Sequence, residues 1–382
     1  MLKQISLLIL CAAAIVCFAT PVQACTSAVV SGKVTPDGRP LLWKNRDTDF
    51  MQNHIDYVKG EKYNFIAVVN SANAYLKEAW MGTNSSGFAL MNTQSYNLVD
   101  VKGDEERGAA NGRVIYRALE VCATVEDFCH FLDTISKPSD IEANFGVIDA
   151  QGGAAMFEVD YYKYVMYDAN NPKDAPYGYI ARTNFSFAGK VNEGAGYVRY
   201  MEADQVLMKA SATGSITPQF IFNDLSRSFR NRMLDIDLRS GAYNRPQASG
   251  WFVDQDFIPR SSTSCSVVVQ GVKPGEKAEL TTMWTLLGYP PTGIAVPLWV
   301  KDAGKLLPGM ERFGKEYEAA LLSDWSLRLA DRVFSYKQGM GTGRYLNWER
   351  LYSPEKGAGY MTAITAAEDE CIMLQLCYEM RG

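Results

Sequence analysis

The chain has 382 residues, of which 47% are hydrophobic, and its formal net charge at pH 7 is −5. This length suits one large domain or two small ones, and the hydrophobic share is ample for a buried core. A nucleic-acid-binding surface needs clustered Lys and Arg, whereas here a mild acidity is spread along the chain, so nucleic acid is excluded as a partner.

The first 24 residues have the features of a secretory signal peptide. Lys3 supplies a positive start, residues 5–18 form an uncharged and mostly apolar core, and Val22 and Ala24 complete a small-residue cleavage site. The apolar core is too short for a comfortable membrane span. We therefore expect residues 1–24 to be removed and residues 25–382 to form a single exported domain, periplasmic or secreted.

Cleavage after Ala24 would make Cys25 the first residue of the mature chain. An N-terminal Cys carries a thiol nucleophile and, in its α-amine, a nearby base. A free thiol titrates near ~8.5 and an α-amine near ~8, so the amine can take the thiol proton close to neutral pH. This pair is the minimum equipment for amide hydrolysis or acyl transfer.

Strand and helix signals alternate in blocks along the chain. We predict strands over residues 25–31 and 40–46, joined by a turn at 35–38 in which Pro36 presets one dihedral angle and Gly38 accepts positive φ. Further strands are predicted at 65–69, 87–93, 144–149, 154–159, 264–270 and 294–300, and helices at 112–122, 125–134, 196–210 and 311–336. This order indicates the α+β class, with stacked layers rather than a regular βαβ wind.

The first predicted hairpin brings Asp47 towards the mature N-terminus. If its turn centres near Asp37, Cys25 lies opposite residues 48–50, and Asp47 lies within about three positions, ~10 Å, of Cys25. A carboxylate there could hold the α-ammonium or orient the α-amine by hydrogen bonding. The alternative is that the charged residues 44–49 simply form a solvated strand end.

The cysteines and histidines favour this chemistry by exclusion. The chain has eight Cys, two of them in the predicted signal peptide, and only two His. Cys122 and Cys129 would lie ~10 Å apart on one helix, too far for a mutual disulfide, and we expect both to be buried small hydrophobes. A papain-like or Ser/His/Asp enzyme would need His54 or His130 as its base, and no motif supports either. The sequence shows no metal-ligand spacing and no nucleotide-binding loop, so neither metal nor cofactor is expected.

Several motifs together resemble one enzyme family. Residues Cys25-Thr26, Asp37-Gly38 and Lys44-Asn45-Arg46-Asp47 are similar to the opening of the N-terminal-nucleophile amidases, in the branch of choloylglycine hydrolases, penicillin V acylases and isopenicillin-N acyltransferases. The resemblance continues in spaced blocks at 87–93, 182–185 and 197–200. It implies an αββα four-layer sandwich, in which two stacked antiparallel sheets are flanked by helices.

The resemblance also implies a set of site residues: Cys25, Asp47, Asn92, Asn184 and Arg199. In that set the thiolate attacks a linear amide, Arg199 favours the thiolate, and side chains of Asn92 and Asn184 hold the oxyanion. Lys44 stands where choloylglycine hydrolases carry Arg and is predicted to contact the substrate. Because Lys lacks the bidentate fork of Arg, this departure disfavours a bile salt and favours the acyltransferase-like branch.

We therefore predict an exported amidase or acyltransferase that acts on a small-molecule N-acyl amide. The sequence leaves open the acyl group, the amine, hydrolysis against transfer, and assembly as a monomer or a homo-oligomer. One alternative is a lipid-anchored binding protein whose Cys25 thiol carries the lipid, although Val22 and Gln23 fit a lipoprotein signal poorly. A second alternative is an N-terminal-Cys dipeptidase, which shares the chemistry and differs in its leaving group.

Overall fold

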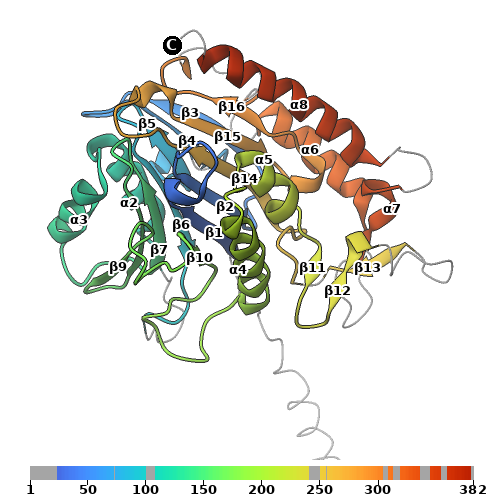
Figure 1. The fold of residues 1–382 in the computed structure, drawn as a ribbon, viewed down its shortest axis with the longest axis horizontal. Coiled ribbons are helices and arrows are strands. Elements are labelled where there is room, and N and C mark those ends of the chain that lie inside the picture. Colours follow the sequence, from blue (N-terminus) through green and yellow to red (C-terminus); the bar gives the residue numbers. More distant parts are fainter. Residues whose placement is uncertain are drawn as a thin grey trace, which may run out of the picture.

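The computed structural model describes residues 24–72, 74–99, 108–240, 250–254, 256–303, 309–312, 319–335, 345–353 and 359–379. Of the predicted signal peptide only Ala24 is among them, and residues 1–23 lie outside the described residues. Two antiparallel sheets, one of six strands and one of seven, dominate the described fold (Figure 1).

The six-stranded sheet carries the start of the predicted mature chain. Its order is β10–β1–β2–β14–β15–β16. The strands are β1 (Cys25–Val30), β2 (Leu41–Asp47), β10 (Tyr179–Arg182), β14 (Thr263–Gln270), β15 (Thr282–Leu287) and β16 (Val296–Leu298). The predicted β1–β2 hairpin is confirmed, but its predicted register is wrong: Cys25 pairs with Arg46, not with residues 48–50. Residues 31–40 form the connection, so its midpoint precedes Asp37.

The seven-stranded sheet is a meander in which strand order follows chain order. Its strands are β3 (Asn53–Val58), β4 (Phe65–Asn70), β5 (Met81–Asn84), β6 (Ala89–Gln94), β7 (Ala143–Ile148), β8 (Ala154–Val159) and β9 (Tyr164–Asp168). The predicted β7–β8 hairpin is confirmed. Its turn is closed by Asp149, whose side chain accepts hydrogen bonds from the backbone nitrogens of Gln151 and Gly153.

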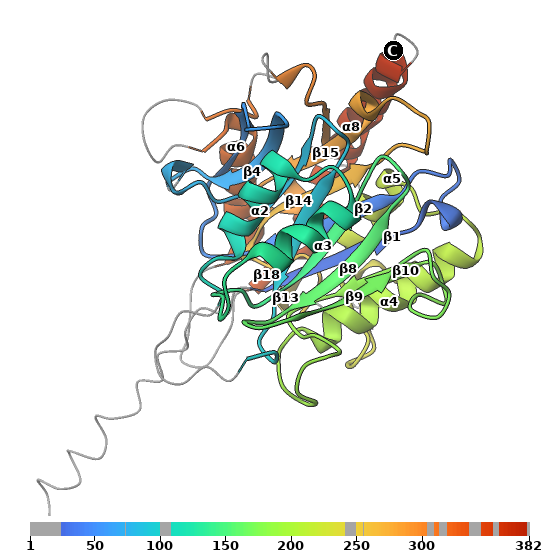
Figure 2. The same cartoon turned by 90° about the vertical axis from the view of Figure 1, so that its left-hand side faces the viewer.

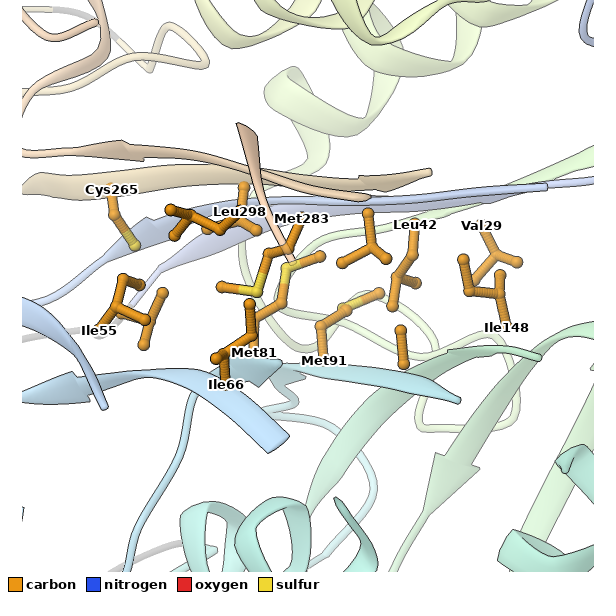
Figure 3. Close-up of a cluster of buried hydrophobic side chains, with 14 of the residues drawn as sticks. Val29, Leu42, Ile55, Ile66, Met81, Met91, Ile148, Cys265, Met283 and Leu298 are labelled. Carbon is orange, nitrogen blue, oxygen red and sulfur yellow. The ribbon is translucent and has the colours of Figure 1, made fainter. Parts of the chain in front are cut away.

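The two sheets stack face to face over an apolar core. Val29 and Leu42 of the first sheet meet Met81, Met91 and Ile148 of the second in this layer (Figure 3). Because side chains alternate along a strand, the odd-numbered residues of β1 and β14 and the even-numbered residues of β2 point into this inter-sheet core. The intervening residues point to the outer face, which helices cover.

Helices lie on both outer faces. The helices α2 (Asn111–Val121) and α3 (Val125–Thr134) cover the seven-stranded sheet. The helix α3 begins at the predicted cap, where Thr124 and Asp127 exchange side-chain and backbone hydrogen bonds. The helices α4 (Tyr197–Ala212), α5 (Pro218–Phe220) and α8 (Tyr360–Glu379) lie against the six-stranded sheet (Figures 1 and 2). The predicted four-layer αββα arrangement is thus confirmed.

The last third of the chain adds smaller elements beside the sandwich. These are β11 (Arg230–Asn231), β12 (Ile236–Asp237), β13 (Trp251–Val253), α6 (Leu321–Val333), β17 (Phe334–Ser335), β18 (Tyr345–Asn347) and α7 (Trp348–Leu351). The predicted helix 311–336 is too long, because Arg312 and Ala320 form a β-bridge and the described helix begins only at Leu321. No helix among the described residues is both long and apolar enough to cross a bilayer.

Five cysteines whose side chains the structure describes are free thiols. These are Cys25, Cys122, Cys129, Cys265 and Cys371. Cys122 is buried, as predicted, whereas Cys129 is half-buried because its helix lies at the protein surface.

Candidate active site

Cys25 is the first residue of β1 and is 5% exposed. Directly paired residues on adjacent strands place their side chains on the same face of a sheet. Cys25 pairs with Arg46, and Arg46 pairs on its other side with Cys265, so the three residues form one row. Cys265 belongs to the inter-sheet core (Figure 3), which places the thiol of Cys25 on that face as well.

Asn184 holds the backbone nitrogen of Cys25. Its Oδ1 accepts hydrogen bonds from Cys25 N at 2.9 Å and from Arg199 Nη2 at 3.0 Å. Its Nδ2 donates to the backbone oxygen of Gln94 at 2.8 Å, which fixes the orientation of the amide. The structure therefore brings Asn184 to Cys25, where its contact is with the nitrogen that trimming after residue 24 would convert to the α-amine.

Arg199 approaches Cys25 from the outer face of the sheet. Its Nη1 donates to the backbone oxygen of Cys25 and, at 2.9 Å, to Oγ1 of Thr26, a residue that faces α4. Its Nε lies 3.0 Å from Oδ1 of Asp256, which balances the charge of a guanidinium that is 1% exposed. Arg199 thus lies close to Cys25, but it contacts the backbone from the face opposite the thiol.

Asp47 lies at the end of β2, one residue beyond the partner of Cys25. Its Oδ1 accepts a hydrogen bond from Thr263 Oγ1 at 2.6 Å, and its Oδ2 lies 3.0 Å from Arg260 Nη2. Burial raises the pKa of Asp47, and the charge of Arg260 opposes that rise. Within the described residues Asp47 forms no hydrogen bond to Cys25 N, so the contact predicted for its carboxylate is made by Asn184 instead.

Lys44 and Asn92 meet across the inter-sheet space. Lys44 Nζ donates to Asn92 Oδ1 at 2.9 Å and to the backbone oxygen of Trp80 at 3.0 Å. Since Oδ1 of Asn92 is turned towards Lys44, its amide NH₂ group points away and keeps the donors that an oxyanion needs. Burial lowers the pKa of Lys44 to about 8, and the nearby thiol of Cys25 opposes that shift.

A cavity of about 470 Å³ adjoins Ala24, on the side of the Cys25 nitrogen. Charged and polar residues line it, among them Arg199, Asp254, Asp256, Arg260, Ser261 and Ser262. Arg260 bridges Asp47 and Asp256, so the lining belongs to a chain of ion pairs behind the nucleophile. Among the described residues no group of three or more His, Cys, Asp or Glu is arranged to hold a metal ion.

Three residues of this site escaped the sequence analysis. Asp256 and Arg260 come from a late segment that carries no motif, and only the fold brings them behind Cys25. Arg46 appeared in the Lys44-Asn45-Arg46-Asp47 motif, but no role was predicted for it. The sequence does contain a signal for Arg46: it lies two residues after Lys44, and residues two apart on a strand point to the same face of the sheet.

The comparison with protein families agrees with this geometry. Residues 34–209 match the model of the acyl-coenzyme A:6-aminopenicillanic acid acyl-transferase family. The predicted family resemblance is confirmed. The matched segment contains Lys44, Asp47, Asn92, Asn184 and Arg199, whereas Cys25 precedes it. The match agrees with the predicted enzyme class, a hydrolase or acyltransferase that acts on linear amides.

No curated protein matches the chain. Among solved structures, a variant of the conjugated bile acid hydrolase from Clostridium perfringens matches at 14% identity over 73% of this chain and 93% of that chain, with a TM-score of 0.42. Penicillin V acylase from Agrobacterium tumefaciens matches at 15% identity, over 72% and 86% of the two chains, with a TM-score of 0.37. The Caenorhabditis elegans N-acylethanolamine-hydrolyzing acid amidase ortholog matches at 16% identity, over 52% and 88%, with a TM-score of 0.36.

Proposed function

We propose that the protein is an exported enzyme that cleaves linear amides through a thioester on Cys25, with the α-amine of the same residue as general base. The observation that carries this proposal is the 2.9 Å hydrogen bond from Cys25 N to Asn184 Oδ1, beside a free thiol at the head of β1. In a chain trimmed after Ala24, this bond would hold the α-amine in one orientation next to its own sulfur.

In the proposed cycle the α-amine of Cys25 takes the thiol proton, and the thiolate attacks the carbonyl carbon of an N-acyl amide. The protonated amine then passes its proton to the leaving nitrogen, and the C–N bond breaks to leave a thioester. Water attacks the thioester to complete hydrolysis, or a second amine attacks it to complete acyl transfer. The amine accepts the proton of the incoming nucleophile, and the thiol is regenerated.

We propose Asn92 as the principal side-chain donor to the oxyanion. Its amide is turned by Lys44, which comes from the opposite sheet, so the donor is oriented before the substrate arrives. Losing one such donor typically raises the barrier by about 3 kcal/mol. Asn184 has one N–H committed to Gln94, so we propose that it serves first as the holder of the α-amine.

The first test is the N-terminus of the exported protein, read by intact mass. A chain that starts at Cys25 with a free thiol supports the proposal. A diacylated start establishes the lipid-anchored alternative, and a start at any other residue refutes the mechanism.

The second test is turnover of a panel of N-acyl amides and dipeptides, followed by release of the amine. We expect C25A to be folded and inactive, whereas C129A, which removes a half-buried thiol on α3, should keep wild-type turnover. Added hydroxylamine, as an acceptor, separates acyl transfer from hydrolysis. Substantial turnover by folded C25A contradicts the proposal, and cleavage of dipeptides alone favours the dipeptidase alternative.

A further inference from the structure

Arg46 lies between two thiols on the inter-sheet face. It pairs with Cys25 on β1 and with Cys265 on β14, and it is 2% exposed. Its Nη1 donates to Asn53 Oδ1 at 2.6 Å, and its guanidinium carbon lies 4.5 Å from the ring centroid of Trp80. Its Nη2 is buried and has no hydrogen-bond partner within the described chain.

This guanidinium differs from other buried arginines because no carboxylate of the described residues forms an ion pair with it. Three comparable arginines each have one: Arg182 with Glu158 at 2.7 Å, Arg199 with Asp256 at 3.0 Å, and Arg227 with Glu368 at 2.6 Å. A buried cation without a counter-ion is costly. Burial lowers the pKa of Arg46 to about 10, and the two cysteines are the largest of the groups that oppose the shift.

The two thiols beside Arg46 are not equivalent. Cys265 lies in the inter-sheet core, where burial raises the pKa of its thiol to about 11, so it stays protonated at neutral pH. Cys25 is at the start of its strand, next to the nitrogen that would act as its base. One strand separates Cys25 from Cys265, or ~10 Å between Cα atoms, which is too far for a disulfide. Cys25, at the end of its strand and beside the nitrogen proposed as its base, is therefore the candidate partner of Arg46.

The other charged groups around the Cys25 thiol are already engaged. Lys44 on the same face donates to Asn92 and Trp80, and with a pKa of about 8 it loses its charge in the range where thiols titrate. Arg199 on α4 is neutralised by an aspartate and lies behind the sheet. The remaining titratable neighbours of Arg46 are Cys265, the α-amine of Cys25 and Glu78, whose charge also raises the pKa of Arg46 and whose carboxylate pairs with Arg113 at 3.5 Å. Of the two cations on the thiol side, Lys44 is held by Asn92 and Trp80, whereas Arg46 keeps a buried nitrogen, Nη2, without a partner among the described residues.

We propose that Arg46 is the counter-ion of the Cys25 thiolate, and that its unpartnered Nη2 is the donor reserved for that charge. An opposite charge within a few ångströms favours the ionised form of a thiol and thereby its reactivity. The use of this pairing in turnover rests on the proposed function. The pairing itself requires only the fold.

The test is the pH dependence of alkylation of Cys25 by iodoacetamide, followed residue by residue by peptide mass mapping. R46M removes the charge and keeps an apolar stem, R46K keeps the charge, and R328M removes an exposed arginine on α6 as the control. We expect R46M to move the alkylation midpoint upward by about one pH unit, which slows alkylation about tenfold at pH 6. R46K should restore most of the rate, and R328M should match the wild type.

The proposal is overturned if folded R46M has the wild-type alkylation midpoint. It is also overturned if Cys25 reacts slowly at the same rate in the wild type, R46K and R46M while Cys265 is alkylated fast. Circular dichroism verifies folding, and R46Q, which keeps a donor for Asn53, replaces R46M if that variant does not fold. The two proposals fail separately. Turnover by C25A refutes the proposed function whatever Arg46 does, whereas an inactive C25A with an unshifted R46M refutes only the role of Arg46.

Discussion

Replacing Arg199 by Met measures how strongly a buried ion pair supports the backbone behind the nucleophile. The guanidinium donates to the backbone oxygen of Cys25, to Thr26, to Asn184 and to Asp256, and it is 1% exposed. Met keeps the apolar stem but leaves these acceptors without their donor. Breaking a buried pair on one side typically costs about 3–5 kcal/mol. Asp256 is 34% exposed and keeps a second arginine partner, so we expect R199M to lower the free energy of unfolding by about 3 kcal/mol, the lower end of that range.

The pair between Arg328 and Asp324 supplies the control. Its N–O distance of 2.7 Å is shorter than the 3.0 Å of the Arg199 pair, but its side chains are 75% and 43% exposed. Because water screens an exposed pair, R328M should cost less than about 0.5 kcal/mol. Urea unfolding followed by circular dichroism measures both variants. Equal losses in the two, or a loss below about 1 kcal/mol in R199M, would refute the reasoning that burial rather than contact distance sets the contribution.

Three further predictions concern pH, packing and turnover. Burial, with a smaller effect of Arg312, lowers the pKa of His54 from 6.5 to about 4. Between these pH values the unfolded chain binds more protons than the folded chain, so the free energy of unfolding should fall by at most about 3 kcal/mol as the pH drops from 6.5 to 4. In urea titrations H54N should reduce this fall, and H130Q should not. A Cβ at Gly146 would lie 2.3 Å from Cε of Met91, so G146A should lose about 1–3 kcal/mol of stability, and an unchanged urea midpoint would contradict the tight inter-sheet packing. K44M frees the amide that Lys44 orients, so kcat should fall on the order of tenfold with little change in KM. A rise in KM with unchanged kcat would reject that orienting role.

The sequence by itself determined several local elements, and it is the source of the chemistry that we propose for Cys25. The hairpin of β1 and β2, the β7–β8 hairpin and the cap of α3 follow from turn residues, strand periodicity and a Thr-Asp pair within a few positions of each other. The resemblance of spaced motifs also indicated the four-layer class and the family. Such features are encoded by neighbouring residues, whose preferences are largely independent of what packs against them.

Only the tertiary structure decided how these pieces face one another. The strand β10 was not predicted, because its hydrogen-bond partner β1 lies in a distant part of the chain. One strand register puts Arg46 beside the thiol of Cys25 and leaves Arg199 behind it, although both cations are equally visible in the sequence. A side chain's face depends on which strand pairs with it and in which register, and a shift of one residue reverses that face. Long-range contacts, absent from any local pattern, therefore determined the electrostatic surroundings of the nucleophile.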